Sequence, residues 1–166
     1  DPATDATFRN RADIVERIKH FSSFNMSDGC WLRHMAKAGP MDHPHSLLFS
    51  VLMDEMGDGV VGHNHSNIYQ DLCHSTGYYP YPMSSRKFAF DESLIESGFQ
   101  LPVFELAASA CTEAYFPELL GMTLQLEWGI YEAKKTIALL EYYGFDTHYY
   151  VMHVGIDNPS NGHAAR

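Results

Sequence analysis

The stretch HVGIDNPSNGH, near the end of the sequence, combines two histidines and an aspartate with two helix-interrupting residues. His153 and Asp157 are four residues apart, which places both side chains on one face of a helix, about one turn apart. His163 follows six residues later and would leave that face in a regular helix. Pro159 and Gly162 are expected to distort the helix and turn His163 back toward the pair. The three groups could then bind a metal ion, although a simple hydrogen bond between His153 and Asp157 explains that pair equally well.

A second stretch, DEMGDGVVGHNH, repeats this arrangement upstream. Glu55 lies on the apolar face of a predicted helix, and His65 follows ten residues later, beyond three glycines. A regular helix would direct these two side chains differently, so the glycines must supply a bend if they are to meet. His63 is the reserve candidate for the histidine. Taken alone, this segment favours a loop with surface histidines over a metal site.

Glu127 supplies a further carboxylate in a strongly apolar segment. We interpret it as facing the core, whereas Glu132 has polar neighbours and is expected to be solvated. The interpretation rests on four helical neighbours, Leu120, Leu124, Ile130 and Tyr131. An ionised carboxylate buried without a partner costs several kcal/mol or changes its pKa, and a cation removes that cost. Glu118 lies in the first turn of the same predicted helix, where the helix dipole favours a negative charge.

These segments together supply three carboxylates and three histidines. The candidate metal ligands are Glu55, His65, Glu127, His153, Asp157 and His163. Mixed carboxylate and imidazole ligation without thiolates suits non-haem iron or manganese better than structural zinc, and six ligands suffice for two ions. Helix bundles are a common frame for such pairs.

The elements that must position these residues are predicted to be helices. Gly39-Pro40 and Gly144 are expected to end two of them, while Ser27 or Asp28 and then Asp146 are expected to cap two N-termini. The predicted helices cover residues 5–22, 27–39, 43–56, 63–77, 101–112, 118–143 and a last segment after 146, with an irregular excursion at 78–100. No alternating strand pattern is present. We therefore expect an all-α fold in a single domain spanning residues 1–166.

Composition excludes several functions. The formal net charge is −10 and no basic cluster is present, so nucleic acid and anionic membranes are not expected partners. No stretch of 18 apolar residues and no signal peptide is visible.

The three cysteines, Cys30, Cys73 and Cys111, are odd in number and far apart, which favours a reducing compartment and a cytoplasmic location. Because the sequence lacks an initial Met and stops just after His163, we expect a fragment of a longer chain.

Three separated segments, DEMGDGVVGHNHSNIY, FPELLGMTLQLEW and HVGIDNPSNGHAA, resemble the haem-oxygenase-like diiron oxidases and oxygenases, an iron-containing redox enzyme family. The resemblance covers roughly residues 28–166. It implies a haem-oxygenase-like helical bundle that binds two non-haem iron ions. The family's ligand pattern is carried onto the chain as Glu55 and His65, then Glu127, then His153, Asp157 and His163. Many members place the last histidine three residues after the aspartate, where this chain has Ser160.

The resemblance implies a diiron oxidoreductase that uses O2 to hydroxylate, desaturate or cleave a small substrate, such as an amino acid or fatty acid derivative. The expected partners are O2, that substrate and an electron donor, with a homodimer left open. Two alternatives stay open as well. One is a cofactorless or thiamin-salvage-type enzyme on the same frame, using the carboxylates and histidines for acid–base work. The other is a non-catalytic metal-binding domain.

Overall fold

A computed structural model of the chain describes residues 5, 7–36 and 39–166. Within these residues the regular secondary structure is helical and no strand is present, which confirms the expected all-α fold. The longer helices are α1 (Arg11–His20), α3 (His43–Glu55), α4 (His65–Ser75), α6 (Gln100–Ala110), α7 (Phe116–Leu126), α8 (Ile130–Tyr143) and α9 (His148–Ile156). The shorter segments are α2 (Ser22–Asn25), α5 (Arg86–Ala89) and the 3-10 turns η2 (Cys30–Leu32), η3 (Gly57–Gly59), η4 (Val61–His63), η5 (Glu96–Phe99) and η6 (His163–Ala165).

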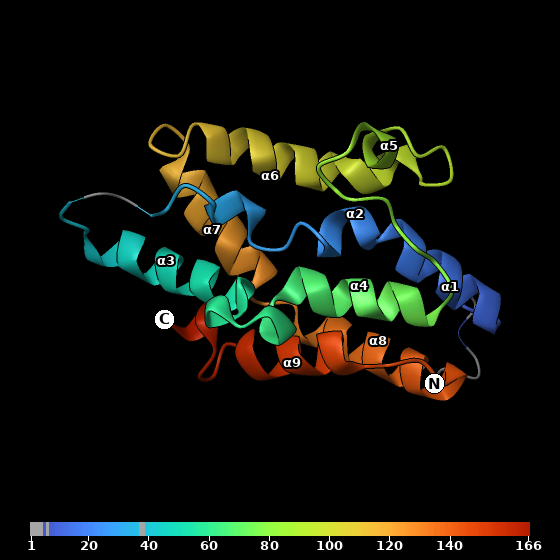
Figure 1. Cartoon of the computed structure of the whole chain (residues 1–166). Helices are drawn as coiled ribbons and strands as arrows, with labels where there is room; N and C mark the ends of the chain where they lie inside the picture. The colour runs from blue at the N-terminus through green and yellow to red at the C-terminus, as the bar shows by residue number, and fades with distance from the viewer. Residues whose placement is uncertain (1–4, 6, 37–38) are drawn as a thin grey trace.

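Two hydrophobic cores hold the helices together. The first core joins α1, α4, α8 and α9; in Figure 1, α4, α8 and α9 lie side by side, and α1 crosses near the right-hand end of α4. The second core joins η2, α3, α6 and α7. The first is built around Ile14, Ile18, Tyr69, Leu72, Leu140 and Tyr149, and the second around Trp31, Leu32, Met35, Leu48 and Leu119. Each such side chain contributes roughly 1.5–3 kcal/mol by leaving water.

The chain passes from one core to the other at helix ends. Glu55 is the last residue of α3 in the second core, and His65 is the first residue of α4 in the first core. Glu127 lies between α7 and α8, which belong to different cores. The polar side chains at the ends of α3, α4 and α7 therefore lie at the boundary between the two cores. There they contact one another and not the apolar side chains of either core.

Local capping explains where several helices begin and end. The side chain of Asp42 accepts a hydrogen bond from the backbone amide of His45 at 3.0 Å and starts α3. Asn64 starts α4 in the same way, accepting from the amide of Asn67 at 3.0 Å. Gly144 ends α8, as predicted. Asp146 accepts from the amide of His148 at 2.8 Å just before α9, close to its predicted capping position.

The helix predicted over residues 27–39 is wrong. Only the turn η2 forms there, after Gly29 in a left-handed conformation with φ 77°, and residues 37–38 lie outside the described part of the chain. Trp31 and Leu32 are fully buried in the second core. Their packing holds this segment as a short turn, so Asp28 does not cap a helix.

The single helix predicted over residues 118–143 is also wrong. The chain turns between Leu126 and Ile130, separating α7 from α8. Gly129 weakens the helix at that point, and the two halves pack in different cores. Glu118 does lie in the first turn of α7, as expected. The helix predicted over residues 5–22 is shorter than expected, because α1 begins at Arg11 and ends at His20. The excursion at 78–100 contains α5 and η5.

None of the helices in the described part of the chain has the length and apolar character needed to cross a lipid bilayer.

Candidate metal centre

Seven acidic and imidazole side chains gather in two groups at the boundary between the cores. The first cluster is Asp28, Glu55, His65 and His153, and the second cluster is Glu127, Asp157 and His163. Within each cluster, one ligand atom from every member lies within 4.8 Å of the others. The clusters contain all six residues that the sequence proposed, together with Asp28. Their assignment as metal ligands remains a prediction.

The glycine-rich loop after α3 brings Glu55 and His65 together. Gly57 has φ 69°, and a Cβ at this position would lie 2.5 Å from the backbone nitrogen of Asn64. The chain can therefore fold tightly back on itself only with glycine here. His63 lies on this loop and is exposed, so the structure places His65, and not the reserve candidate, in the first cluster.

Glu55 and His65 face each other without a hydrogen bond. Both side chains are 2% exposed, and Oε2 of Glu55 lies 2.5 Å from Nδ1 of His65. Neither atom has a hydrogen-bond partner, because the pair lacks the alignment that a hydrogen bond needs. Oδ1 of Asp157 in the second cluster is likewise buried without a partner. Buried polar atoms are nearly always satisfied, so these unpaired atoms fit groups that would each bind a nearby cation.

Asp28 and His153 form the other half of the first cluster. The Tyr149 hydroxyl donates to Oδ2 of Asp28 at 2.8 Å, and Nε2 of His153 lies 3.2 Å from the same oxygen. Nδ1–H of His153 donates to the Tyr149 carbonyl oxygen at 2.6 Å. This contact fixes the tautomer that leaves Nε2 directed at the cluster, which is the usual arrangement of a metal-binding histidine.

Burial and close contact between carboxylates and imidazoles change the pKa values in the first cluster. Burial raises the pKa of Glu55 well above its usual value, and the negative charge of Asp28 raises it further. Burial opposes the ionised form of Asp28, but His153 and His65 outweigh it and hold the pKa of Asp28 below its usual range. Burial likewise lowers the pKa of His153, yet contact with Asp28 raises it overall to about 9. A metal ion would displace the protons on Glu55 and His153.

The second cluster forms because the chain doubles back after α9. Asp157 is the first residue past the helix. A Cβ on Gly162 would overlap the carbonyl oxygen of Ile156, so only glycine permits this close approach. The backbone of Gly162 has φ −86° and ψ −163°, which other residues can also adopt, so glycine is needed here because it has no side chain and not for a positive φ. The reversal returns His163 to within 3.6 Å of Asp157, measured between Nδ1 and Oδ1.

His163 joins three carboxylates. Nδ1 lies 2.8 Å from Oε2 of Glu127, and Nε2 lies 2.7 Å from Oδ2 of Asp54 on α3. Burial raises the pKa of Glu127 to about 7, and nearby Asp157 adds to this effect. Burial lowers the pKa of His163, but its contacts with Asp157 and Glu127 raise it overall to about 10. If Nδ1 bound a metal, Asp54 would accept the proton on Nε2 and orient the ring.

Glu127 is buried, as predicted, but not for the predicted reason. It is 3% exposed, whereas Leu120 and Leu124 are each nearly half exposed and Tyr131 is 85% exposed. The buried face of α7 instead carries Leu119 and Thr123, with Glu127 four residues further on. Glu132 is exposed, as expected, with 77% of its side chain accessible.

Asp28 is the cluster residue that sequence reasoning missed. We interpreted it as a helix cap, because aspartate before a helical pattern is a common N-terminal signal. The apolar residues that follow, Trp31 and Leu32, are fully buried and draw Asp28 inward. The one local indication that Asp28 is buried is that it directly precedes this apolar segment. Asp54 was also missed. It directly precedes Glu55, and nothing in its spacing to other polar residues indicates that it contacts His163.

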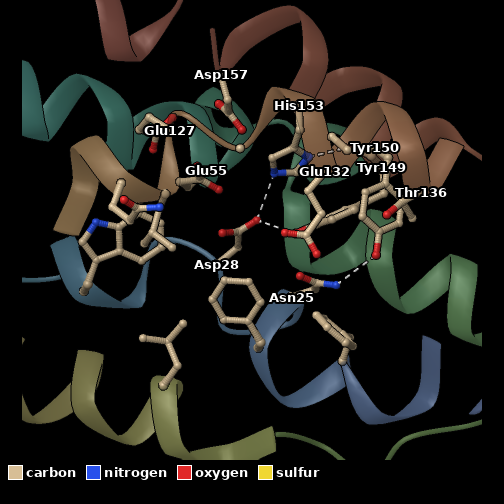
Figure 2. Close-up of a pocket in the computed structure, with 18 of the residues that line it drawn as sticks. Asn25, Asp28, Glu55, Glu127, Glu132, Thr136, Tyr149, Tyr150, His153 and Asp157 are labelled. Atoms are coloured by element: carbon tan, nitrogen blue, oxygen red, sulfur yellow. Dashed lines mark hydrogen bonds and ion pairs between the residues drawn. The ribbon is translucent and has the colours of Figure 1, made fainter. Parts of the chain in front are cut away.

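Both clusters border one cavity of about 400 Å³. Asp28, Glu55, Glu127, His153 and Asp157 all line it, and Figure 2 shows Glu55 between Asp28 and Glu127. Apolar side chains form much of the remaining wall, including Phe21, Phe24, Trp31, Leu101 and Leu126, and α1, α8 and α9 also contribute to it. A cavity of this kind, apolar with a few converging polar groups, is typical of small-molecule sites.

A separate buried carboxyl group, that of Glu105, interacts electrostatically with Asp28. Glu105 on α6 is 0% exposed, and Sγ of Cys30 donates to its Oε2 at 3.4 Å. Its Oε1 has no partner. Burial raises the pKa of Glu105 to about 7. The folded protein therefore favours the protonated form, and this contribution to stability is complete below pH 4.5 and declines as the pH rises to about 7.

Glu105→Gln should remove that decline, because glutamine is neutral at every pH. We expect the variant to exceed the wild type in stability by about 3 kcal/mol at pH 8, or roughly 5–10 °C in Tm, and by little at pH 4.5. Thermal melts across this pH range measure the difference. Glu92→Gln, at an exposed position, is the control. A difference between Glu105→Gln and wild type that does not change with pH would contradict the prediction.

The comparisons with known proteins agree with this geometry. Residues 16–166 match a protein family described as iron-containing redox enzyme, which bears out the resemblance noted in the sequence. No curated protein and no solved structure matches the chain. The matched range includes every member of both clusters, and their carboxylate and imidazole groups are ligands that iron accepts. The chain therefore belongs to the family of iron-containing redox enzymes.

Proposed function

We propose that the protein is a non-haem diiron oxidase or oxygenase that uses O2 to oxidise a small organic substrate. The observation that carries this proposal is the pair of buried clusters bordering one cavity. Asp28, Glu55, His65 and His153 would hold one iron ion, and Glu127, Asp157 and His163 would hold the other. Glu55 lies between Asp28 of the first cluster and Glu127 of the second (Figure 2), so its carboxylate would be held near both ions.

Iron bound in this way would supply redox chemistry toward O2. The chain itself supplies the fixed ligands, the oriented histidines and a cavity in which the substrate is shielded from water. Tyr149 and Asp54 hold the ligand groups in place through their contacts with Asp28, His153 and His163. The proposed partners are O2, an electron donor and a small substrate that is hydroxylated, desaturated or cleaved.

Metal analysis separates this proposal from its alternatives. Protein purified without air should contain about two irons per chain, one for each cluster. Adding O2 to the ferrous protein should produce a transient visible absorption. A cofactorless or thiamin-salvage-type enzyme should bind no iron. A storage or purely structural site should bind iron but oxidise slowly without a transient, and either result would overturn the proposal.

Iron should also stabilise the fold, because it replaces protons and relieves repulsion among buried carboxylates. A ligand at about 100 times its Kd stabilises the folded state by about 2.7 kcal/mol. For a chain of this size we expect ferrous iron to raise the Tm of the iron-free protein by roughly 5–10 °C. Thermal melts under nitrogen measure the shift, with Mg²⁺ as the control ion because it prefers all-oxygen sites. An equal shift with Mg²⁺ would argue against a mixed imidazole and carboxylate centre.

A further inference from the structure

A buried arginine lines the cavity that the clusters border. Arg17 on α1 has a side chain that is 10% exposed. Its Nη1 donates to the Tyr150 hydroxyl at 3.2 Å, and its Nη2 donates to Oγ1 of Thr136 at 3.1 Å. The guanidinium carbon also lies 4.6 Å from the centre of the Phe21 ring. These contacts hold a permanent positive charge in a fixed position.

The two hydroxyl groups that Arg17 contacts have protons left to donate. Tyr150 accepts from Arg17 and also from Nδ2 of Asn25 at 3.4 Å, and Thr136 accepts from Arg17. Both residues are more than nine-tenths buried and both line the cavity. Among the described residues, neither hydroxyl has an acceptor for its own proton. The guanidinium and the two hydroxyls are thus hydrogen-bond donors that line the same cavity. They match a ligand group that accepts hydrogen bonds and donates none, such as a carboxylate.

One carboxylate approaches Arg17, but only weakly. Oε1 of Glu132 lies 3.9 Å from Nη2, beyond hydrogen-bonding distance. The Glu132 side chain is 77% exposed, and ion pairs with an exposed partner contribute little. The charge of Arg17 is therefore largely available to a ligand in the cavity.

The arginine lies away from the clusters. Figure 2 shows Thr136 and Tyr150 on the side of the cavity opposite Glu55 and Glu127, with Asp28 between them. Because Arg17 bonds to both Thr136 and Tyr150, its guanidinium lies at that far side. Apolar side chains, including Phe21, Phe24 and Leu101, line the cavity as well.

We propose that Arg17, Thr136 and Tyr150 form a carboxylate-binding subsite at the end of the cavity away from the clusters, so that the substrate binds with its carboxylate at Arg17 and its apolar body extending toward the clusters. The inference deepens the proposed function, since it takes this cavity as the substrate site. A cationic substrate is the opposite expectation, because the cavity is also lined by acidic side chains. In the iron-loaded protein the acidic side chains of the two clusters would bind the metal ions, whereas Arg17 would remain free to bind an anion.

Binding of three matched probes tests the subsite. Phenylbutyrate, phenylbutanol and phenylbutylamine share one apolar body and differ in charge. Trp31 lines the cavity and can report binding by fluorescence, and Trp128→Phe removes the other, exposed tryptophan. In the iron-loaded protein, kept without O2, phenylbutyrate should bind about tenfold more tightly than phenylbutanol, the scale expected for hydrogen bonds to a charged group.

Variants then assign the selectivity to Arg17. Arg17→Gln should reduce the preference for phenylbutyrate over phenylbutanol about tenfold, whereas a merely structural role would weaken all three probes equally. Glu132→Gln should increase the preference about twofold to fivefold, because it removes the competing charge without altering Arg17. Glu141→Gln removes the same charge from an exposed position on the same helix and should change nothing. Glu132→Gln keeps the test decisive if Arg17→Gln fails to fold.

The outcomes separate this inference from the proposed function. Equal binding of phenylbutyrate and phenylbutanol by iron-loaded protein, or tightest binding of phenylbutylamine, overturns the carboxylate subsite and leaves the iron centre standing. Protein that binds no iron but prefers phenylbutyrate through Arg17 overturns the proposed function and leaves the subsite standing.

Discussion

Glu127→Ala should reduce iron content from about two ions per chain to about one, because the second cluster loses one of its three members. His163 would then keep only Asp157 within the cluster, together with the more exposed Asp54. The first cluster shares no member with the second and should stay loaded. Iron analysis of protein prepared without air measures the change.

Glu132→Ala is the matched control for this prediction. It removes a glutamate five positions further along the chain, where the side chain is exposed and belongs to neither cluster. We expect its iron content to equal that of the wild type. If both variants lost iron equally, or if neither did, the assignment of Glu127 as a ligand would be wrong.

Asp28→Asn should weaken iron binding at the first cluster by roughly 100-fold or more, because asparagine keeps the size of the side chain but not its charge. Asparagine can still accept the hydrogen bond from Tyr149, so the fold should be retained. Titration with ferrous iron measures the affinity. Asp71→Asn removes a charge from an exposed position on α4 and should bind iron normally.

The same variant has a second readout that needs no metal. In the iron-free wild type the negative charge of Asp28 raises the pKa of His153 to about 9, against the lowering effect of burial. Asp28→Asn removes that charge, so burial dominates and the pKa of His153 should fall. Titration of the histidine ring by NMR follows this change. An unchanged pKa would show that Asp28 does not contact His153 as the structure indicates.

The helices and several of their ends could be predicted from sequence because they depend on neighbours along the chain. The stop at Gly144 and the bend after Glu55 follow from glycine, and the start of α9 near Asp146 follows from local capping. The spacing of one helical turn predicted that His153 and Asp157 act as a pair, but the structure divides them between the two clusters, because α9 ends at Ile156 and Asp157 already lies past the helix. The break between α7 and α8 could not be found in this way, because it depends on the two halves packing in different cores.

Within the site, Glu127 shows how far burial can be predicted from sequence. Its burial was expected from apolar neighbours, yet Leu120 and Leu124 face outward and a different side of α7 is buried. An apolar pattern predicts that one face of a helix is buried. When apolar residues lie on several sides of the helix, the pattern does not identify which face that is. Only the packing of α7 in the second core decides that question.

The amino-acid sequence alone was enough to name carboxylates and histidines that could bind a metal, and its three widely separated cysteines argued against a thiolate site. Packing in three dimensions grouped these side chains and added Asp28 and Arg17, which lie in none of the motifs that the sequence analysis identified. The physical reason is the range of the interactions involved. Turns and caps form between residues a few positions apart, whereas the clusters form where two separately packed cores meet and bring distant helix ends together.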